Sequence, residues 1–231
     1  MPTVLIACCP HDPPTVYGYF YLRQLLTPIL TKNGHKVVFL KNANLQSFRY
    51  ALEKHNPDFV ILNGHGGYKA FKGCNENVIL SVKSYDPIFE TKIFLDNAEW
   101  MSNRIVYLFT CNTGKELAFK LIQHGALAVA AYTSSFFFLT ENSHPPTDHK
   151  AYPFFYSALQ LPIKLAEGYN FADACAATKK AFKHHVEQAE AQGDELAAKY
   201  LWHNLTNFVA YGNMNARLIN PIPLLYPEVK T

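Results

Sequence analysis

The stretch FVILNGHGG, residues 59–67, joins an apolar run to a glycine-rich turn around one histidine. The run 59–62 is apolar at every position, which is typical of a strand buried on both faces of a parallel sheet. Three glycines then surround His65. Glycine suits a tight turn, and it also lets another group approach the backbone closely. The stretch therefore predicts a buried strand that ends either in a plain turn or at a functional histidine.

Apolar runs of strand length alternate with helical patterns along the first 132 residues. Helices between buried strands predict an α/β fold of three layers, with a mostly parallel central sheet and helices on both faces. Right-handed crossovers place the carboxyl ends of the strands at one edge, where such sheets bind ligands. The predicted strands are 4–8, 36–40, 59–62, 105–109 and 126–132, and the predicted helices are 17–33, kinked at Pro28, 45–54 and 115–124.

The remaining segments are less regular. We expect a small antiparallel pair of 78–82 with 92–95, and a polar and aromatic loop over 133–150. Helices are predicted at 171–192 and 194–205, and late strands at 208–211 and 216–219. A length of 231 residues suits one domain, with a core of 1–220 and a tail of 221–231.

Composition excludes several classes of protein. The net charge of +3 is too small to indicate nucleic acid binding, and no apolar run is long enough to span a membrane. The first residues lack the features of a signal peptide. The five cysteines are irregularly spaced, so we expect no disulfide framework and a cytoplasmic location. No cofactor is indicated, and no metal site is expected because Cys8, Cys9 and His11 lack further ligands at suitable spacing.

A second motif, IVYLFTCNTG at residues 105–114, places Cys111 just after a predicted buried strand. His65 occupies the equivalent position after its own strand. If the two strands are neighbours, they lie about 4.8 Å apart and both residues face one cleft. A capping box at 113–116 would start a helix right after Cys111, and the helix dipole would stabilise its thiolate. The amides of Gly66 and Cys111 would then face one oxyanion. Taken singly, each residue is more typical of a structural role, and the pairing favours catalysis.

These two motifs resemble those of the caspase-like (clan CD) cysteine peptidases, in which one hydrophobic block ends in His-Gly and another in a small residue and Cys. The blocks here are FVILNGHG and IVYLFTC. The continuation CNTGKELAFKLIQHGALAVAAYTS, 111–134, is most similar to the gingipain and CHAT branch. The late segment FVAYGNMNARL, 208–218, is similar to that branch's GDP segment, although Asn213 and Met214 replace Asp and Pro.

The resemblance implies a cysteine endopeptidase that acts on a peptide or protein substrate through a thioester acyl-enzyme. His65 matches the catalytic histidine, Cys111 the nucleophile, and Gly66 the glycine whose amide helps to form the oxyanion hole. Thr110 stands where many relatives have alanine. Caspase-like domains also pair through an edge strand, so a homodimer is an expectation. In the family, the loops after the first and fifth strands shape the pocket for the residue before the cut bond.

Those two loops correspond to residues 9–16 and 133–149. Asp12, Glu141 and Asp148 would give these loops an acidic pocket that selects Arg or Lys. Relatives with that preference often carry Asp two residues before the cysteine, and Phe109 occupies that position here. Either His144 or His149 could replace His65 as the base. The substrate-binding candidates from the two loops are Cys9, His11, Asp12, Ser134, Phe136, Glu141 and Asp148.

Two other functions remain open at this stage. A glutamine amidotransferase-like hydrolase also places cysteine at a strand-to-helix elbow, but in a Gly-x-Cys-x-Gly turn. Phe109 and Thr113 stand where that pattern has its glycines. The other alternative is a catalytically silent caspase-like module that binds partners, which the intact Cys–His pair disfavours.

Overall fold

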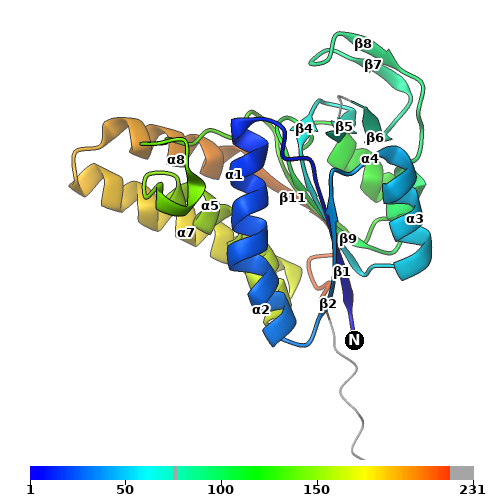
Figure 1. Ribbon diagram of the computed structural model, residues 1–231, viewed down its shortest axis with the longest axis horizontal. Helices are drawn as coiled ribbons and strands as arrows, with labels where there is room; N and C mark the ends of the chain where they lie inside the picture. Colours follow the sequence, from blue (N-terminus) through cyan, green and yellow to red (C-terminus); the bar gives the residue numbers. More distant parts are fainter. Residues whose placement is uncertain (75–76, 219–231) are drawn as a thin grey trace, which may run out of the picture.

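A six-stranded sheet forms the centre of the computed structural model, which describes residues 1–74 and 77–218. The strand order is β11-β10-β9-β3-β1-β2 (Figure 1). Five strands are parallel, and β11 runs antiparallel to β10. The strands are β1 (Thr3–Cys8), β2 (Lys36–Lys41), β3 (Phe59–Asn63), β9 (Ile105–Phe109), β10 (Ala128–Tyr132) and β11 (Phe208–Gly212).

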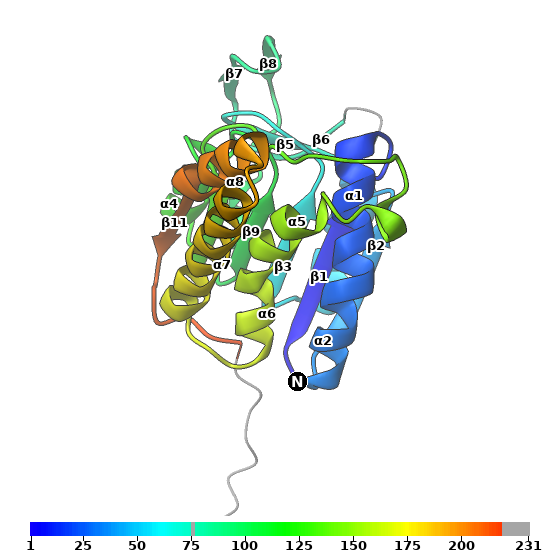
Figure 2. The same ribbon diagram turned by 90° about the vertical axis from the view of Figure 1, so that its left-hand side faces the viewer.

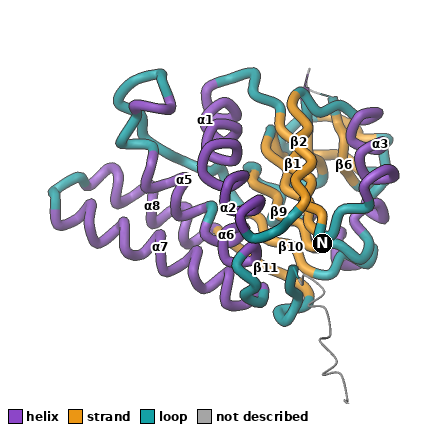
Figure 3. The backbone as a smooth tube through the Cα atoms, turned by 60° about the horizontal axis from the view of Figure 1, so that its bottom comes forward, coloured by secondary structure: helices purple, strands orange, loops and turns teal. Residues whose placement is uncertain are grey.

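Helices cover both faces of this sheet, which confirms the predicted three-layer α/β architecture (Figures 2 and 3). Alternate residues of β1 enter different cores: Val4 and Ile6 on one side, Leu5 and Ala7 on the other. A strand buried on both faces must be apolar throughout, as its sequence is. One face carries α3 (Leu45–His55) and α4 (Leu117–Gln123); the other carries α1 (Pro13–Tyr21), α2 (Thr27–Lys32), α5 (Tyr152–Ala158), α6 (Gln160–Ala166), α7 (Phe171–Ala191) and α8 (Glu195–Asn207).

The first predicted helix divides into three segments. Between α1 and α2 lies a π-helical turn, η1 (Leu22–Leu26), and Pro28 occupies the first turn of α2. Proline lacks an N–H and its ring crowds the preceding turn, so the chain changes its hydrogen-bonding pattern there. The helix also begins earlier than predicted because Asp12 caps it, accepting a hydrogen bond from the Thr15 amide at 3.1 Å.

The irregular segment after β3 forms two small antiparallel sheets above the edge of the central one (Figure 1). The predicted pairing of 78–82 with 92–95 is wrong, because each run pairs with its nearer neighbour in sequence across a short connection. The first small sheet contains β4 (His65–Gly66), β5 (Ala70–Lys72) and β6 (Val78–Ser81), and the second contains β7 (Ser84–Asp86) and β8 (Thr91–Ile93).

The carboxyl-terminal half contains both confirmed and missed elements. The predictions of α7, α8 and β11 are confirmed, whereas α5 and α6 have no counterpart among the predicted elements. Residues 216–218 form no strand, because the chain there turns back to cap α7, and the carbonyl of Ala216 accepts from the amide of Phe171 at 2.8 Å. Residue 219 and the predicted tail 221–231 lie outside the described residues.

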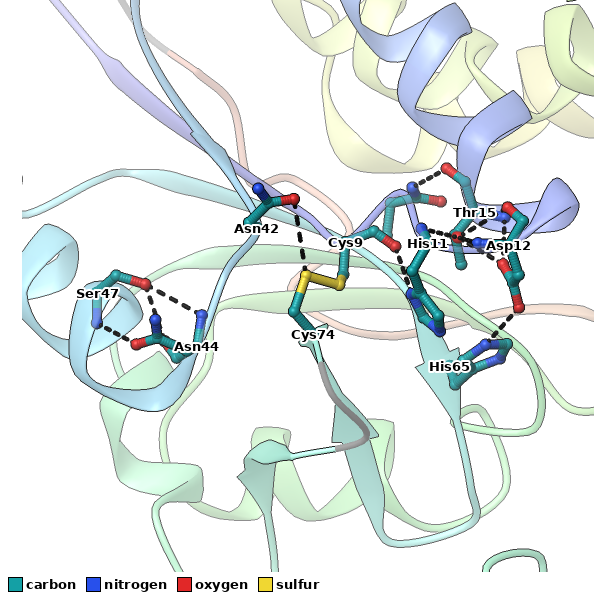
Figure 4. Close-up of a disulfide and its surroundings, with 10 residues drawn as sticks. Cys9, His11, Asp12, Thr15, Asn42, Asn44, Ser47, His65 and Cys74 are labelled. Carbon is teal, nitrogen blue, oxygen red and sulfur yellow. Dashed lines mark hydrogen bonds and ion pairs between the residues drawn. A yellow bond between two sulfur atoms is a disulfide. The ribbon is translucent and has the colours of Figure 1, made fainter.

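The cysteines depart from the sequence-based expectation. Cys9 and Cys74 form a disulfide that joins the loop after β1 to the connection between β5 and β6 (Figure 4). Cys8, Cys111 and Cys175 are free thiols. The two cysteines are 65 residues apart, and no motif in the sequence indicated that they pair. Among the described residues, no helix is both long and apolar enough to cross a membrane.

Candidate active site

The carboxyl ends of three neighbouring strands bring the two sequence motifs together. β3 lies between β1 and β9, with Cys8 opposite Asn63 and Asn63 opposite Phe109. The segments that leave these strands therefore start side by side at one edge of the sheet. His65 and Cys111 each come two residues after the end of their strand. Since β3 and β9 are neighbours in the sheet, the predicted proximity of the two strand ends is confirmed.

His65 lies on β4, and its ring contacts the carboxylate of a residue from another loop. Its Nε2 stands 2.7 Å from Oδ2 of Asp12 (Figure 4). The other carboxylate oxygen, Oδ1, accepts hydrogen bonds from the amide and the hydroxyl of Thr15 at 3.1 and 2.5 Å. Burial raises the pKa of Asp12, but the bonds from Thr15 and the charge of His65 outweigh this effect and lower it. Asp12 is therefore an ionised partner of the imidazole.

The structure shows a contact of Asp12 that was not expected from the sequence. Sequence reasoning assigned it to substrate selection, because it is an acid in the loop after the first strand. The structure places it against His65, where a carboxylate fixes the tautomer and orientation of an imidazole. The signal was present in the Asp-Pro-Pro-Thr stretch at 12–15, a helix start that holds Asp12 at the sheet edge.

Cys111 occupies a tight turn, which corrects the prediction of a thiol at a helix N-terminus. The helix α4 begins only at Leu117, and the predicted capping box at 113–116 does not form. Instead, the amide of Thr113 donates to the carbonyl of Cys111 at 2.8 Å, and Asn112 adopts a left-handed backbone with φ of 62°. Asparagine tolerates this conformation better than most residues. The turn, and not a helix dipole, positions the thiol.

The thiol of Cys111 is half-buried and protonated in its resting state. Burial raises its pKa above the ordinary value of 9.0, although the amide of Phe136 and the hydroxyl of Ser135 donate to the sulfur and oppose the shift. The Phe136 amide lies 3.4 Å from Sγ. A thiol with a raised pKa reacts as a nucleophile only when a neighbouring base removes its proton.

Gly66 lies directly against the turn that carries Cys111. A Cβ atom at this position would overlap the carbonyl oxygen of Cys111 and come within 2.6 Å of Oγ1 of Thr110. The amide of Gly67 pairs with the carbonyl of Ala70 at 2.9 Å, and alternation along an antiparallel ladder turns the Gly66 amide away from β5. Close packing thus accounts for glycine here, and the Gly66 amide is not used by the β4–β5 ladder.

His65 and Cys111 line one small cavity of about 50 Å³. Its other walls include four phenylalanines: Phe109, Phe136, Phe138 and Phe155. The ring of Phe109 packs edge-on against Phe136 at 5.2 Å between centroids. Phe136 is the only one of the seven sequence-based pocket candidates that lines this cavity.

The other pocket candidates have different environments. Asp148 is 2% exposed and accepts a 2.5 Å hydrogen bond from the Tyr17 hydroxyl, so it holds the loop together and does not face a substrate. Cys9 is fully buried in the disulfide, which removes it as a substrate contact. Glu141 is exposed and accepts from the His149 amide at 2.8 Å. The carbonyl of Ser134 accepts from the Asn112 amide at 3.1 Å, which supports the turn that carries Cys111.

The alternative bases do not reach the cavity. His144 contacts Thr147 at 3.3 Å through Nδ1, and neither His144 nor His149 lines the cavity that holds Cys111. His11 instead lies beside the catalytic candidate, with its ring centroid 5.1 Å from that of His65. His11, Asp12 and His65 each offer one ligand atom, all within 4.8 Å of one another, although no metal site was expected from the sequence.

The fold matches that of a known cysteine proteinase. Two solved structures of gingipain RgpB superpose with a TM-score of 0.58 at 12% identity: a crystal structure of the Arg-specific cysteine proteinase gingipain R, and a complex of the Porphyromonas gingivalis RgpB pro- and mature domains. They cover 92% and 94% of this chain, which spans 46% and 48% of theirs. No protein-family model matches the sequence, and no curated protein matches it significantly. The chain therefore has a caspase-like fold, as predicted.

Proposed function

We propose that this chain is a cysteine endopeptidase in which Cys111 is the nucleophile and His65 transfers protons. The observation that carries the proposal is the meeting of these two side chains in one cavity, at the carboxyl edge of a sheet whose fold is shared with a cysteine proteinase. Asp12 acts as a positioning residue through its 2.7 Å contact with His65. The substrate is a peptide or protein segment.

The tautomer of His65 follows from its partner. An ionised carboxylate only accepts hydrogen bonds, so Nε2 of His65 carries the proton shared with Asp12. In the neutral ring, Nδ1 then holds the lone pair. We propose that this nitrogen accepts the proton of the Cys111 thiol. The raised pKa of the thiol keeps that proton on sulfur until the attack.

The reaction then proceeds in two halves. Sulfur bonds to the peptide carbonyl carbon as its proton moves to His65, and the amides of Gly66 and Cys111 stabilise the oxyanion. Collapse of this intermediate breaks the C–N bond, and Nδ1 returns the proton to the leaving amine. Water, activated by the same nitrogen, hydrolyses the thioester and regenerates the thiol.

We propose a preference before the cut other than the basic one expected from the sequence. Asp12 is bound to His65 and Asp148 is buried beneath Tyr17, so neither carboxylate is available as a dedicated partner for Arg or Lys. Four phenylalanines line the cavity beside Cys111, and a cationic side chain would lose its hydration there. We propose a small apolar residue at this position.

A peptidyl acyloxymethyl ketone, which alkylates cysteine peptidases at the nucleophile, tests the proposal. Mass spectrometry after labelling should place one adduct on Cys111, and His65→Ala should slow labelling strongly. Probes that carry Ala, Arg and Asp before the warhead report the preference, and the alanine probe should react fastest. Absence of an adduct on Cys111 would favour a binding module, whereas ammonia release from glutamine without peptide cleavage would favour an amidohydrolase.

A further inference from the structure

The loop after β1 and the strand β4 bring together a group of ligands that the peptidase chemistry does not fully use. His11 and Asp12 come from the loop, and His65 from β4 (Figure 4). One ligand atom from each of the three lies within 4.8 Å of the other two. We infer that these residues form a binding site for a divalent transition-metal ion of the zinc class, and that the bound ion blocks His65.

The ligand chemistry fits zinc. Two imidazoles and one carboxylate form the three-protein-ligand set that leaves a fourth position for water. Ligands at about 2.0–2.1 Å from a tetrahedral ion stand roughly 3.3 Å apart, so the present group needs only small side-chain movements. The side chains of His65 and Asp12 are 34% and 30% exposed, which leaves a path for an ion from solvent.

The imidazole of His11 is already oriented by a second contact. Its Nδ1 lies 3.0 Å from the carbonyl oxygen of Cys9, and a carbonyl only accepts, so Nδ1 carries the ring proton. Nε2 then carries the lone pair that binds a metal. Such a hydrogen bond from the other ring nitrogen to a carbonyl is the usual outer support of a metal-binding histidine.

The backbone of the site is held in place from two directions. The disulfide between Cys9 and Cys74 anchors the chain just before His11. Thr15 holds Oδ1 of Asp12, which leaves Oδ2 directed toward His65. A site whose ligands are held before binding loses less conformational entropy when the ion arrives.

The ion would take the place of the proton that His65 shares with Asp12. In the neutral ring, that proton moves from Nε2 to Nδ1, so the imidazole binds the ion without losing a proton to solvent. Nδ1 then lacks the lone pair that the proposed peptidase needs to accept the thiol proton. The inhibitory consequence rests on the proposed function, whereas metal binding itself does not.

Binding is best measured on the full chain without a polyhistidine tag and with Cys111→Ala, which removes the half-buried thiol beside His65 and any turnover. Titration calorimetry with Zn²⁺, and the visible spectrum of Co²⁺ as a substitute ion, should report one site per chain. Adding His11→Ala or His65→Ala should weaken binding at least about tenfold. His124→Ala, which removes an exposed histidine beyond α4, should leave the affinity unchanged.

Two results would overturn the site: no Co²⁺ or Zn²⁺ binding by the Cys111→Ala chain, or binding that His11→Ala and His124→Ala affect equally. Inhibition of the wild-type chain by Zn²⁺, reversed by a chelator, is a separate readout. If the site binds zinc but no peptidase activity is found, the metal site stands and the proposed function fails. If peptidase activity is found without zinc binding, the metal site fails alone.

Discussion

Nε2 of His65 lies 2.7 Å from Oδ2 of Asp12, and this pair links the loop after β1 to the strand that carries the histidine. The contact joins residues 53 positions apart through a sheet in which β1 and β3 are neighbours. In the proposed mechanism this contact orients the imidazole, so that Nδ1 is the nitrogen that exchanges protons with Cys111.

Replacing Asp12 by asparagine tests whether the carboxylate positions His65. Asparagine is as good an N-cap as aspartate, so α1 should keep its start and the thermal unfolding midpoint should change little. The loss of a charged hydrogen-bond acceptor, worth ~1.4 kcal/mol, should lower kcat about tenfold with KM nearly constant. A fall in kcat/KM that comes entirely from KM would place Asp12 in substrate binding instead.

The raised pKa of Cys111 predicts an unusual pH dependence of its alkylation. Because burial raises the pKa above the ordinary value of 9.0, the pH at which the rate of reaction with iodoacetamide reaches half its maximum should lie above that of an ordinary cysteine. The adduct is quantified by mass spectrometry, with Cys111→Ala identifying the background. A rate already constant below pH 7 would show a resting thiolate and contradict this account.

The strands and the two motif residues were predictable because strong local signals determine them. Runs such as Ile105–Phe109 are apolar on both faces, and the glycines of 64–67 mark the strand end. The Asp12–His65 contact and the Cys9–Cys74 disulfide were not predictable, since each depends on how distant loops pack. The predicted helix start after Cys111 was wrong because Asn112 and Thr113 form a turn of their own.

Reduction of the disulfide should destabilise the chain. A bridge that closes a 65-residue separation restricts the unfolded state by about 4 kcal/mol in the loop-entropy estimate. Urea unfolding of the wild-type chain should therefore shift to lower midpoint on adding dithiothreitol. In Cys74→Ser the same reductant should cause no further shift, and an equal shift in both chains would argue against this bridge.

The aromatic cavity predicts a size limit on the residue before the cut. Phe138 lies 4.9 Å from Phe155 between ring centroids, and Phe138→Ala should enlarge the cavity. In a peptide library, the rate of cleavage after Leu or Met should then rise by roughly 10-fold or more relative to cleavage after Ala. Phe137→Ala is the matched control, because Phe137 packs against Tyr200 outside this cavity. Improved cleavage after Arg in either variant would contradict an apolar pocket.

The most direct test of the central claim is the hydrolysis rate of internally quenched peptides by the wild-type chain, Cys111→Ala and His65→Ala. Circular dichroism establishes that all three are folded. The account predicts peptide-bond cleavage by the wild-type chain, none above background with Cys111→Ala, and a loss of at least 100-fold with His65→Ala, since a positioned acid–base group contributes about 10²–10⁴-fold. Cleavage by Cys111→Ala at the wild-type rate would contradict it.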